Sequence, residues 1–281
     1  MKLKFLLPCA AFAVIALASC KKDNITNETD EIETTFALSV NEGLSENLTQ
    51  DANDVLNEAA FDKNLQGAGV VAGTEGTTGT LSCATITVTP ASGFPKTIVI
   101  DFGTAGCTSN NGITRKGIIN VTLTDSLRRP GSVATMTFNN YFVGGYKKEG
   151  TITWTNTSTS GVKSWSRVFV NGKITAPNGS FWLHEGTQNV VQTAGASTNT
   201  LLDDVYSITG TRTITNAAGR VRVGTVITAL QKKTICENID QGVYQIQGPN
   251  HVATINYGDG TCDRIATISI DGTPPRTFLL R

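Results

Sequence analysis

Residues 118–154 read IINVTLTDSLRRPGSVATMTFNNYFVGGYKKEGTITW, and this stretch decides the fold class. Apolar and polar residues alternate within it in three short runs, and Gly144-Gly145 separates the second run from the third. Alternation with a period of two is typical of strands that have one buried face, and a Gly-Gly pair is typical of a hairpin turn. The stretch therefore predicts consecutive antiparallel strands joined by short connections.

The same pattern continues on both sides of this stretch, from Leu81 to near the C-terminus, with further turn signals at Asn111-Gly112, Asn171-Gly172, Asn178-Gly179 and Asp271-Gly272. No helical period follows residue 80, whereas a parallel sheet would need crossover helices. About a dozen strands are too many for one flat open sheet. We therefore expect an all-β domain over residues 80–281, an antiparallel meander that forms a β-sandwich or a curled or closed barrel-like sheet.

The N-terminus has the form of a secretory leader. Lys2 and Lys4 precede an apolar run from Phe5 to Leu17, which is too short to span a bilayer. The sequence Leu17-Ala18-Ser19-Cys20 resembles the lipobox of bacterial lipoproteins, in which a signal peptidase cuts before a diacylated cysteine. This resemblance implies that residues 1–19 are a signal peptide and that Cys20 carries the lipid. The alternative is an ordinary secretory signal with an incidental Cys20.

Two further segments precede the body. Residues 20–35 are polar and mostly acidic, so we expect a tether between membrane and domain. Residues 36–79 predict a short strand (36–40), one short helix (44–59) with Ser45 as its N-cap, and a loop rich in Gly and Thr (67–79).

Composition narrows the possible partners. The chain has 42 Thr and 28 Gly in 281 residues, which fits many short strands, and its net charge of zero excludes a typical nucleic-acid-binding domain. The charge is nevertheless zoned: residues 23–62 hold 11 acidic and no basic residues, whereas residues 63–281 hold 19 basic and 12 acidic ones. Either the acidic segment folds against the basic body, or the body meets an anionic surface such as lipopolysaccharide or acidic glycan.

Four cysteines remain after the leader, and an even number in an exported chain predicts disulfides. Of the three possible pairings we favour Cys83–Cys107 and Cys236–Cys262, because each pair flanks about two strands that should be neighbours. Each bridge would close a loop of about 25 residues and stabilise the fold by roughly 3 kcal/mol in the chain-entropy model. The alternative, a four-Cys zinc site, lacks any Cys-x-x-Cys spacing.

Several passages together resemble a family of uncharacterised bacteroidete lipoproteins. They are FPKTIVIDFG (94–103) leading to Gly106-Cys107-Thr108, TRKGII (114–119), DVYSITG (204–210), Lys232-Lys233 before Cys236, and YGDGTCD (257–263). Arg264 departs from the pattern, which has Asn after the last Asp. The resemblance implies an all-β lipoprotein and brings no activity, substrate or catalytic residue.

Few groups are candidates for catalysis or metal binding. The two histidines, His184 and His251, lack metal-ligand spacing, and no Gly-x-Ser-x-Gly occurs. Asp259 and Asp263 flank one turn, but a pair of carboxylates is too few for Ca²⁺. We therefore expect no metal, no cofactor and no enzymatic activity. One alternative to a non-enzymatic role is a hydrolase that uses two carboxylates. The candidates for this pair are Asp101, Glu149, Glu185, Asp203 and Asp204.

Aromatic residues provide the last candidate site. Trp165 lies in the otherwise polar sequence KSWSR, so it is the candidate for an aromatic platform that stacks on a sugar ring. We favour the alternative, in which Trp154 and Trp182 fill the core and Trp165 covers a sheet edge. We expect a non-enzymatic lipoprotein with a binding or structural role at the cell envelope. Its lipid on Cys20 would hold it to the outer membrane, on the periplasmic face or the cell surface. The first alternative is a glycan- or lipid-binding module that uses exposed aromatics or a β cavity.

Overall fold

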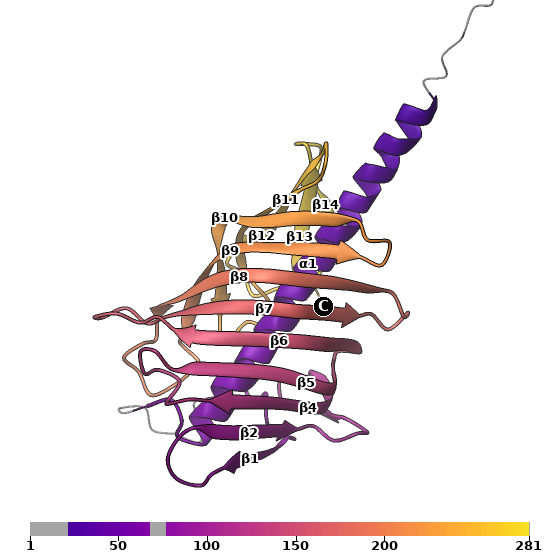
Figure 1. Cartoon of the computed structure of the whole chain (residues 1–281). Coiled ribbons are helices and arrows are strands. Elements are labelled where there is room, and N and C mark those ends of the chain that lie inside the picture. The colour runs from indigo at the N-terminus through magenta and orange to yellow at the C-terminus, as the bar shows by residue number, and fades with distance from the viewer. Residues whose placement is uncertain (1–21, 68–76, 281) are drawn as a thin grey trace, which may run out of the picture.

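The computed structural model describes residues 22–67 and 77–280, which form one long helix and one sheet (Figure 1). The predicted leader, Cys20 and most of the predicted loop 67–79 lie outside the described residues. The elements in chain order are α1 (Lys22–Asp62), β1 (Thr85–Thr89), β2 (Lys96–Asp101), β3 (Cys107–Thr108), β4 (Thr114–Leu123), β5 (Val133–Val143), β6 (Tyr146–Asn156), β7 (Ser164–Thr175), β8 (Phe181–Ala194), β9 (Val205–Asn216), β10 (Val221–Lys233), β11 (Gln241–Gln247), β12 (Val252–Asp259), β13 (Ile265–Ile270) and β14 (Arg276–Leu279).

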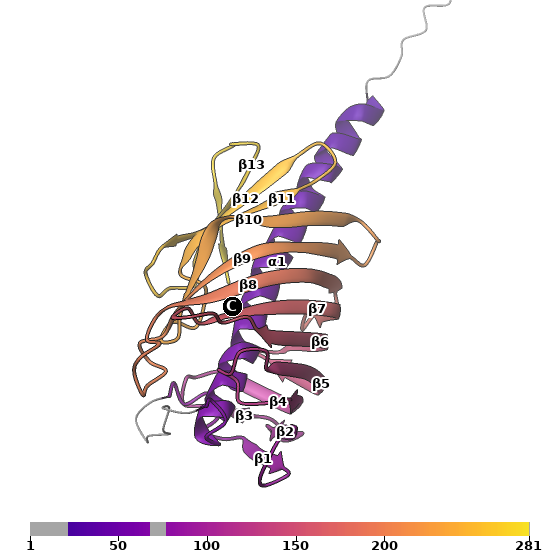
Figure 2. The same cartoon turned by 60° about the vertical axis from the view of Figure 1, so that its left-hand side comes forward.

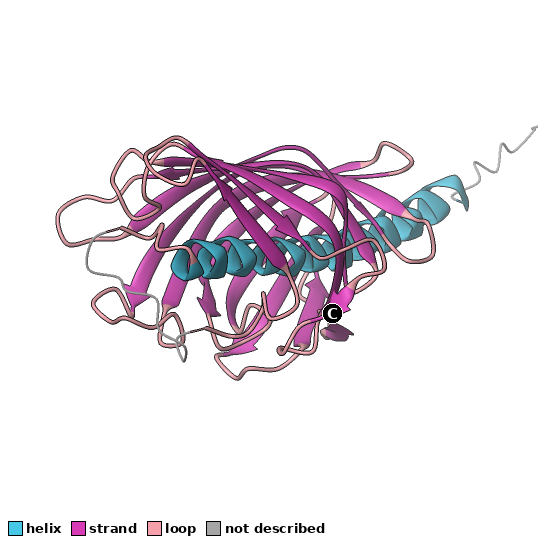
Figure 3. Ribbon diagram, turned by 90° about the horizontal axis from the view of Figure 1, so that it is seen from below, coloured by secondary structure: helices cyan, strands magenta, loops and turns pink. Residues whose placement is uncertain are grey.

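The strands form a single antiparallel meander. Each strand pairs with the next along the chain, except that β2 pairs with β4 and the short β3 pairs with β4 beside it. The two end strands of the sheet, β1 and β14, do not pair with each other. The sheet is therefore open, and it curls around α1 so that the helix lies in its concave face (Figure 3). The predicted all-β meander is confirmed in its curled form.

Irregular pairing in mid-strand explains why the sheet curls. The register shifts inside the pairs β4–β5, β5–β6, β6–β7, β7–β8 and β9–β10. Gly117 and Gly186 lie in this zone with φ of 84° and 147°, and a Cβ at either would collide with the carbonyl oxygen of Asn140 or Thr211, respectively. Bulges of this kind bend a strand and increase its twist, so a row of them curls the open sheet around the helix.

One predicted turn belongs to this zone of bulges. Asn171-Gly172 lies inside β7, where Asn171 has φ of 52° and the register shifts between Phe169 and Gly172. The predicted turn at Asn171-Gly172 is therefore wrong: the left-handed backbone conformation that Asn favours here produces a bulge rather than a reversal of the chain.

The helix differs most from the sequence-based expectation. Residues 36–40 and Ser45 lie inside α1, so the predicted strand and N-cap are wrong, and the predicted tether is helical from Lys22 onward. The Ser45 hydroxyl donates to the carbonyl of Asn41 (2.8 Å) instead of capping a helix. Every residue from 42 to 53 is buried because the sheet surrounds the helix. The part of α1 that precedes the predicted helix, residues 22–43, is rich in polar and acidic residues and has no continuous apolar stripe, so no periodicity marks where the helix begins.

The faces of the sheet are also unusual. In β8 and β10 the aliphatic side chains of Leu183 and Val223 point outward and are 41% and 45% exposed, whereas Trp182, His184 and Arg222 are buried against the helix side. The inner face is thus rich in aromatic and charged groups. Among the described residues, no helix is both long enough and apolar enough to cross a membrane.

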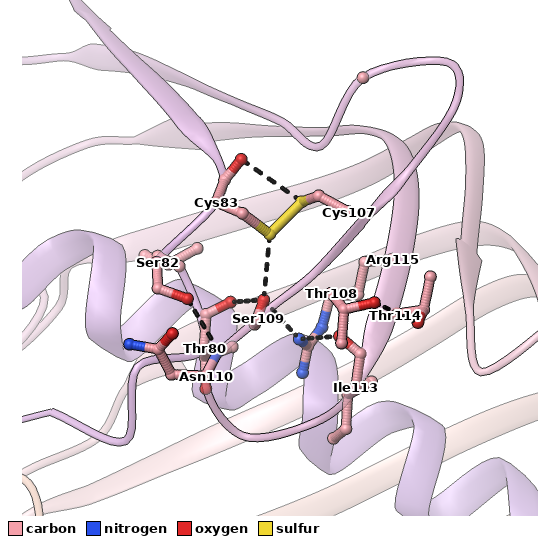
Figure 4. Close-up of a disulfide and its surroundings, with 12 residues drawn as sticks. Thr80, Ser82, Cys83, Cys107, Thr108, Ser109, Asn110, Ile113, Thr114 and Arg115 are labelled. Atoms are coloured by element: carbon pink, nitrogen blue, oxygen red, sulfur yellow. Dashed lines mark hydrogen bonds between the residues drawn. A yellow bond between two sulfur atoms is a disulfide. The ribbon is translucent and has the colours of Figure 1, made fainter.

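Both predicted disulfides are present. Cys83–Cys107 joins the segment before β1 to β3, and Cys236–Cys262 joins the β10–β11 and β12–β13 connections, with Cα separations of 6.1 and 5.1 Å. Figure 4 shows that the first bridge lies beside Ser109, whose hydroxyl donates to the Thr80 carbonyl (2.5 Å). The bridges therefore tie connecting segments at either end of the meander.

Candidate functional site

The interface between α1 and the inner face of the sheet is lined by opposite charges. Buried basic residues from five different strands face this part of the helix: Arg115, Lys148, Arg167, Arg212 and Lys232. The helix contributes the acidic residues Glu42, Glu46, Asp51 and Asp54, which lie within one stretch of about three turns. The acidic segment thus folds against the basic body, which is the first of the two interpretations of the charge zoning.

Glu46 is the centre of this network. Its carboxylate pairs with Arg212 and with Arg167 (3.2 Å), and it accepts hydrogen bonds from Gln188 (2.7 Å) and Gln50 (2.5 Å). Burial would raise the pKa of Glu46, but Arg212 and Arg167 outweigh burial and lower it. Glu46 is therefore held ionised in the interior, with both oxygens occupied.

Glu42, one turn before Glu46, shares the same guanidinium. Its Oε1 lies 2.5 Å from Arg212 Nη2. Burial raises the pKa of Glu42 and outweighs Arg212, with Glu46 adding repulsion. The pKa of Glu42 is thus raised and the pKa of Glu46 lowered, although both carboxylates contact Arg212. The two differ because Glu46 also accepts hydrogen bonds from Arg167 and two glutamines.

A second pair lies further along the helix. Asp51 accepts two hydrogen bonds from one edge of the Arg115 guanidinium, from Nε to Oδ2 (3.0 Å) and from Nη2 to Oδ1 (2.5 Å). This fork geometry is the strongest form of an Arg–carboxylate pair. Arg115 Nη1 also donates to Ser109 (3.2 Å), which connects the pair to the Cys83–Cys107 bridge (Figure 4).

Two buried basic residues, Lys148 and His184, have fewer hydrogen-bond partners than their nitrogens could use. Lys148 donates to the Thr49 hydroxyl (3.1 Å), and burial together with Arg212 and Arg167 lowers its pKa to about 7. The ring nitrogens of His184 are buried without a hydrogen-bond partner, and burial lowers its pKa well below the usual value. His184 is thus a neutral inner-face residue.

A small cavity separates the C-terminal third of α1 from the sheet. Its volume is about 20 Å³ for the centre of a water-sized sphere, which is room for about one water molecule. Trp154, Trp165 and Tyr206 line its sheet side, and Asn53 and Asp54 line its helix side. Trp154 Nε1 and Asn53 Oδ1 are buried without a hydrogen-bond partner. The Trp154 nitrogen is a donor and the Asn53 oxygen is an acceptor, so the cavity suits a hydroxyl group or a water, which can both accept and donate.

Carboxylates with raised pKa values adjoin this cavity. Burial raises the pKa of Asp54 despite Lys232 at 3.0 Å. Tyr206 donates its hydroxyl to Asp204 (2.9 Å), and burial raises the pKa of Asp204 to about 6. Perturbed carboxylates beside an aromatic cavity are the kind of cluster found at binding and catalytic sites, although ion-pair networks produce them too.

The structure places Trp165 on the inner face of the sheet. It is 6% exposed, its Nε1 donates to the Leu127 carbonyl (3.3 Å), and its ring meets Tyr206 edge-on at 6.3 Å. Trp154 and Trp182 are buried as well. An exposed stacking platform at Trp165 is therefore excluded in this conformation, and so is a position that covers an edge of the sheet.

The remaining sequence candidates lie apart from this cavity. Glu149 and Glu185 line an open depression of about 430 Å³ on the outer face, while Asp101 and Asp203 accept local hydrogen bonds. Asp259 accepts the amide of Thr261 (3.1 Å), as expected of a tight turn. In the described part of the chain, the one group of potential metal ligands is Cys236, Asp240 and Cys262, and both of its sulfurs belong to a disulfide.

His251 lies where α1 enters the sheet and connects three segments. Its Nδ1 is 2.6 Å from Asp271, after β13, and its Nε2 is 3.7 Å from Glu31 on α1. The hydrogen bond with Asp271 and the charge of Glu31 raise the pKa of His251. Asp271 in turn has a lowered pKa because it accepts the Val252 amide and the imidazole.

Comparison of the chain with protein-family models, with curated proteins and with solved structures finds no match. Its functional interpretation therefore depends on the residues described above.

Removing the central carboxylate tests the charge network. We expect Glu46→Gln to lower the free energy of unfolding by about 3–5 kcal/mol, because two buried guanidinium groups lose their main partner. Urea denaturation measures this loss. The matched control is Glu33→Gln, because Glu33 pairs with Arg276 at 3.4 Å with side chains 61% and 53% exposed. The control should cost about 1 kcal/mol or less. Equal losses in the two variants would contradict a buried network.

The two histidines should titrate in opposite directions from the usual pKa of about 6.5. We expect NMR titration to place His251 above this value and His184 below it, because one faces carboxylates and the other is buried without a partner. His251 then stabilises the fold fully below pH ~6.5, and this contribution is lost as pH rises through its raised pKa. His184 favours the fold above pH ~6.5, and that contribution is lost as pH falls. His251→Gln should remove the first trend only, and a His184 signal that titrates above 6.5 would refute its burial.

Proposed function

We propose that this chain is a lipid-anchored protein of the bacterial cell envelope with a non-enzymatic, binding or structural role. One observation carries the proposal: the lipobox-like sequence ending at Cys20 stands just before Lys22, where α1 begins, and α1 then forms the core of the folded domain. A lipid on Cys20 would thus be joined directly to the element that the sheet surrounds.

Two further features support an envelope location. Paired disulfides persist in oxidising compartments such as the periplasm or the cell surface. The resemblance of the motifs around Cys107 and Cys262 to bacteroidete lipoproteins agrees with the same assignment. We place the protein at the outer membrane, on its periplasmic face or at the cell surface.

A binding module for a small hydroxylated ligand is the second candidate. The unpaired Trp154 Nε1 and Asn53 Oδ1 at the aromatic cavity favour it. The volume of this cavity limits the occupant to a group about the size of one hydroxyl or water, so a whole sugar ring would require α1 to move.

Metabolic labelling with a palmitate analogue tests the anchor. We expect the wild-type protein to incorporate the label and Cys20→Ala to lose it, because the acyl chains need the Cys20 sulfur and amino group. Cys9→Ala is the matched control: Cys9 lies in the predicted leader, so labelling should persist. Label retained by Cys20→Ala would refute the proposed function.

A further inference from the structure

The N-terminal part of α1 extends beyond the sheet. Figures 1 and 2 show several turns of the helix projecting from the end of the curled sheet that is opposite β1 and β2. Glu28, Thr29 and Asp30 are exposed, and Asp30 forms an ion pair with Arg220 of the sheet (2.7 Å). We call the end of the sheet where α1 enters the rim.

Three hairpin connections form the rim, and each holds α1. The β9–β10 turn supplies Arg220, the β11–β12 turn supplies Asn250 and His251, and β14, after the β13–β14 turn, supplies Arg276. Asn250 donates two hydrogen bonds to the Glu31 carboxylate, one from its backbone N–H (3.1 Å) and one from its side-chain Nδ2 (2.9 Å). These contacts reach α1 from different turns, so they restrain it from more than one side.

Two arginines reinforce the restraint one turn further in. Arg222 Nε donates to the Thr35 hydroxyl (2.8 Å). The guanidinium of Arg276 lies 3.6 Å from the centre of the Phe36 ring, which is a close cation–π contact. Every residue of α1 from 42 to 53 is buried, so the helix cannot pivot at the rim without breaking the interior network.

The length of chain outside the rim is short. Lys22 to Asp30 rises about 12 Å as a helix. Cys20 and Lys22 are separated by two residue steps, which span at most about 7 Å. The chain from Cys20 to Asp30 can therefore span at most about 20 Å, whereas α1 continues for about 48 Å from Asp30 to Asp62.

We propose that the rim is the surface of this protein that faces the lipid leaflet, and that α1 is a rigid stalk that fixes this orientation. The inference rests on the proposed acylation of Cys20. Its partner is the headgroup layer of a phospholipid membrane rather than the acyl-chain region. The exposed residues of the three turns include no large apolar side chain, which suits the polar headgroup layer; Arg220 and Arg276, 44% and 53% exposed, are each paired with a carboxylate of α1, Asp30 and Glu33 respectively. The exposed residues of the three turns are 217–220, 249–250 and 271–276.

Energy transfer to the membrane tests this orientation. A donor dye is attached through an azide-bearing amino acid at Ala218, on the rim, or at Ser92, in the β1–β2 turn at the opposite end. The acylated protein is placed in vesicles of phosphatidylethanolamine and phosphatidylglycerol that carry an acceptor on the headgroup. We expect severalfold higher transfer from position 218 than from position 92, because α1 runs for about 48 Å from Asp30 at the rim toward the opposite end of the sheet.

A flexible insertion supplies the matched control. Twelve Gly and Ser residues placed between Lys21 and Lys22 should leave the fold intact and reduce the difference between the two positions. Equal transfer from both positions without the insertion would overturn the stalk. Protein coupled through Cys20 to maleimide-phosphatidylethanolamine repeats the comparison without cellular acylation. Failure of palmitate labelling would thus refute the proposed anchor, whereas equal transfer in the coupled protein would refute the orientation.

Discussion

The rest of the structure depends on the pairing between buried carboxylates of α1 and buried cations of the sheet. Charges taken out of water are costly, and a buried pair is tolerated only when geometry and further hydrogen bonds compensate. Glu46 meets this condition through Arg167, Arg212 and two glutamines. Because Asp51 and Arg115 form a second pair at another strand, α1 has one position along the groove in which both are satisfied.

This constraint accounts for the polarity of the sheet. An inner face that carries Arg212, Lys148 and His184 cannot pack against an ordinary apolar helix, and an open curled sheet without α1 would leave these groups uncompensated. Bulges along the middle of the strands let the sheet bend closely enough to reach the helix from several sides. The helix therefore acts as the core of the domain rather than as a lid or an appendage.

Local signals in the sequence were sufficient for the strands, most turns and both disulfides, since alternation and Asn-Gly pairs act over a few residues. The extent of α1 could not be predicted in this way, because its N-terminal part, residues 22–43, is rich in polar residues that the sheet and its turns pair with only in the folded chain. The polar residues of the inner face did leave a signal. Arg212 is two residues from Ile214 in β9, and His184 is two residues from Trp182 in β8, so each polar residue lies on the same face of its strand as a buried apolar one. Trp165 was misplaced because its polar neighbours Ser164 and Ser166 belong to the partly exposed face.

Hydrogen exchange of the α1 amides is the most direct test of a helix held by its surroundings. If the buried carboxylates lock α1 into the sheet, the amides of residues 42–60 exchange only through global unfolding, at the free energy measured for the central strands β7–β9. That free energy is expected to be about 5–15 kcal/mol. Exchange of these amides at a clearly lower free energy than β7–β9, with the sheet still protected, would show that α1 leaves the groove independently and would contradict the account.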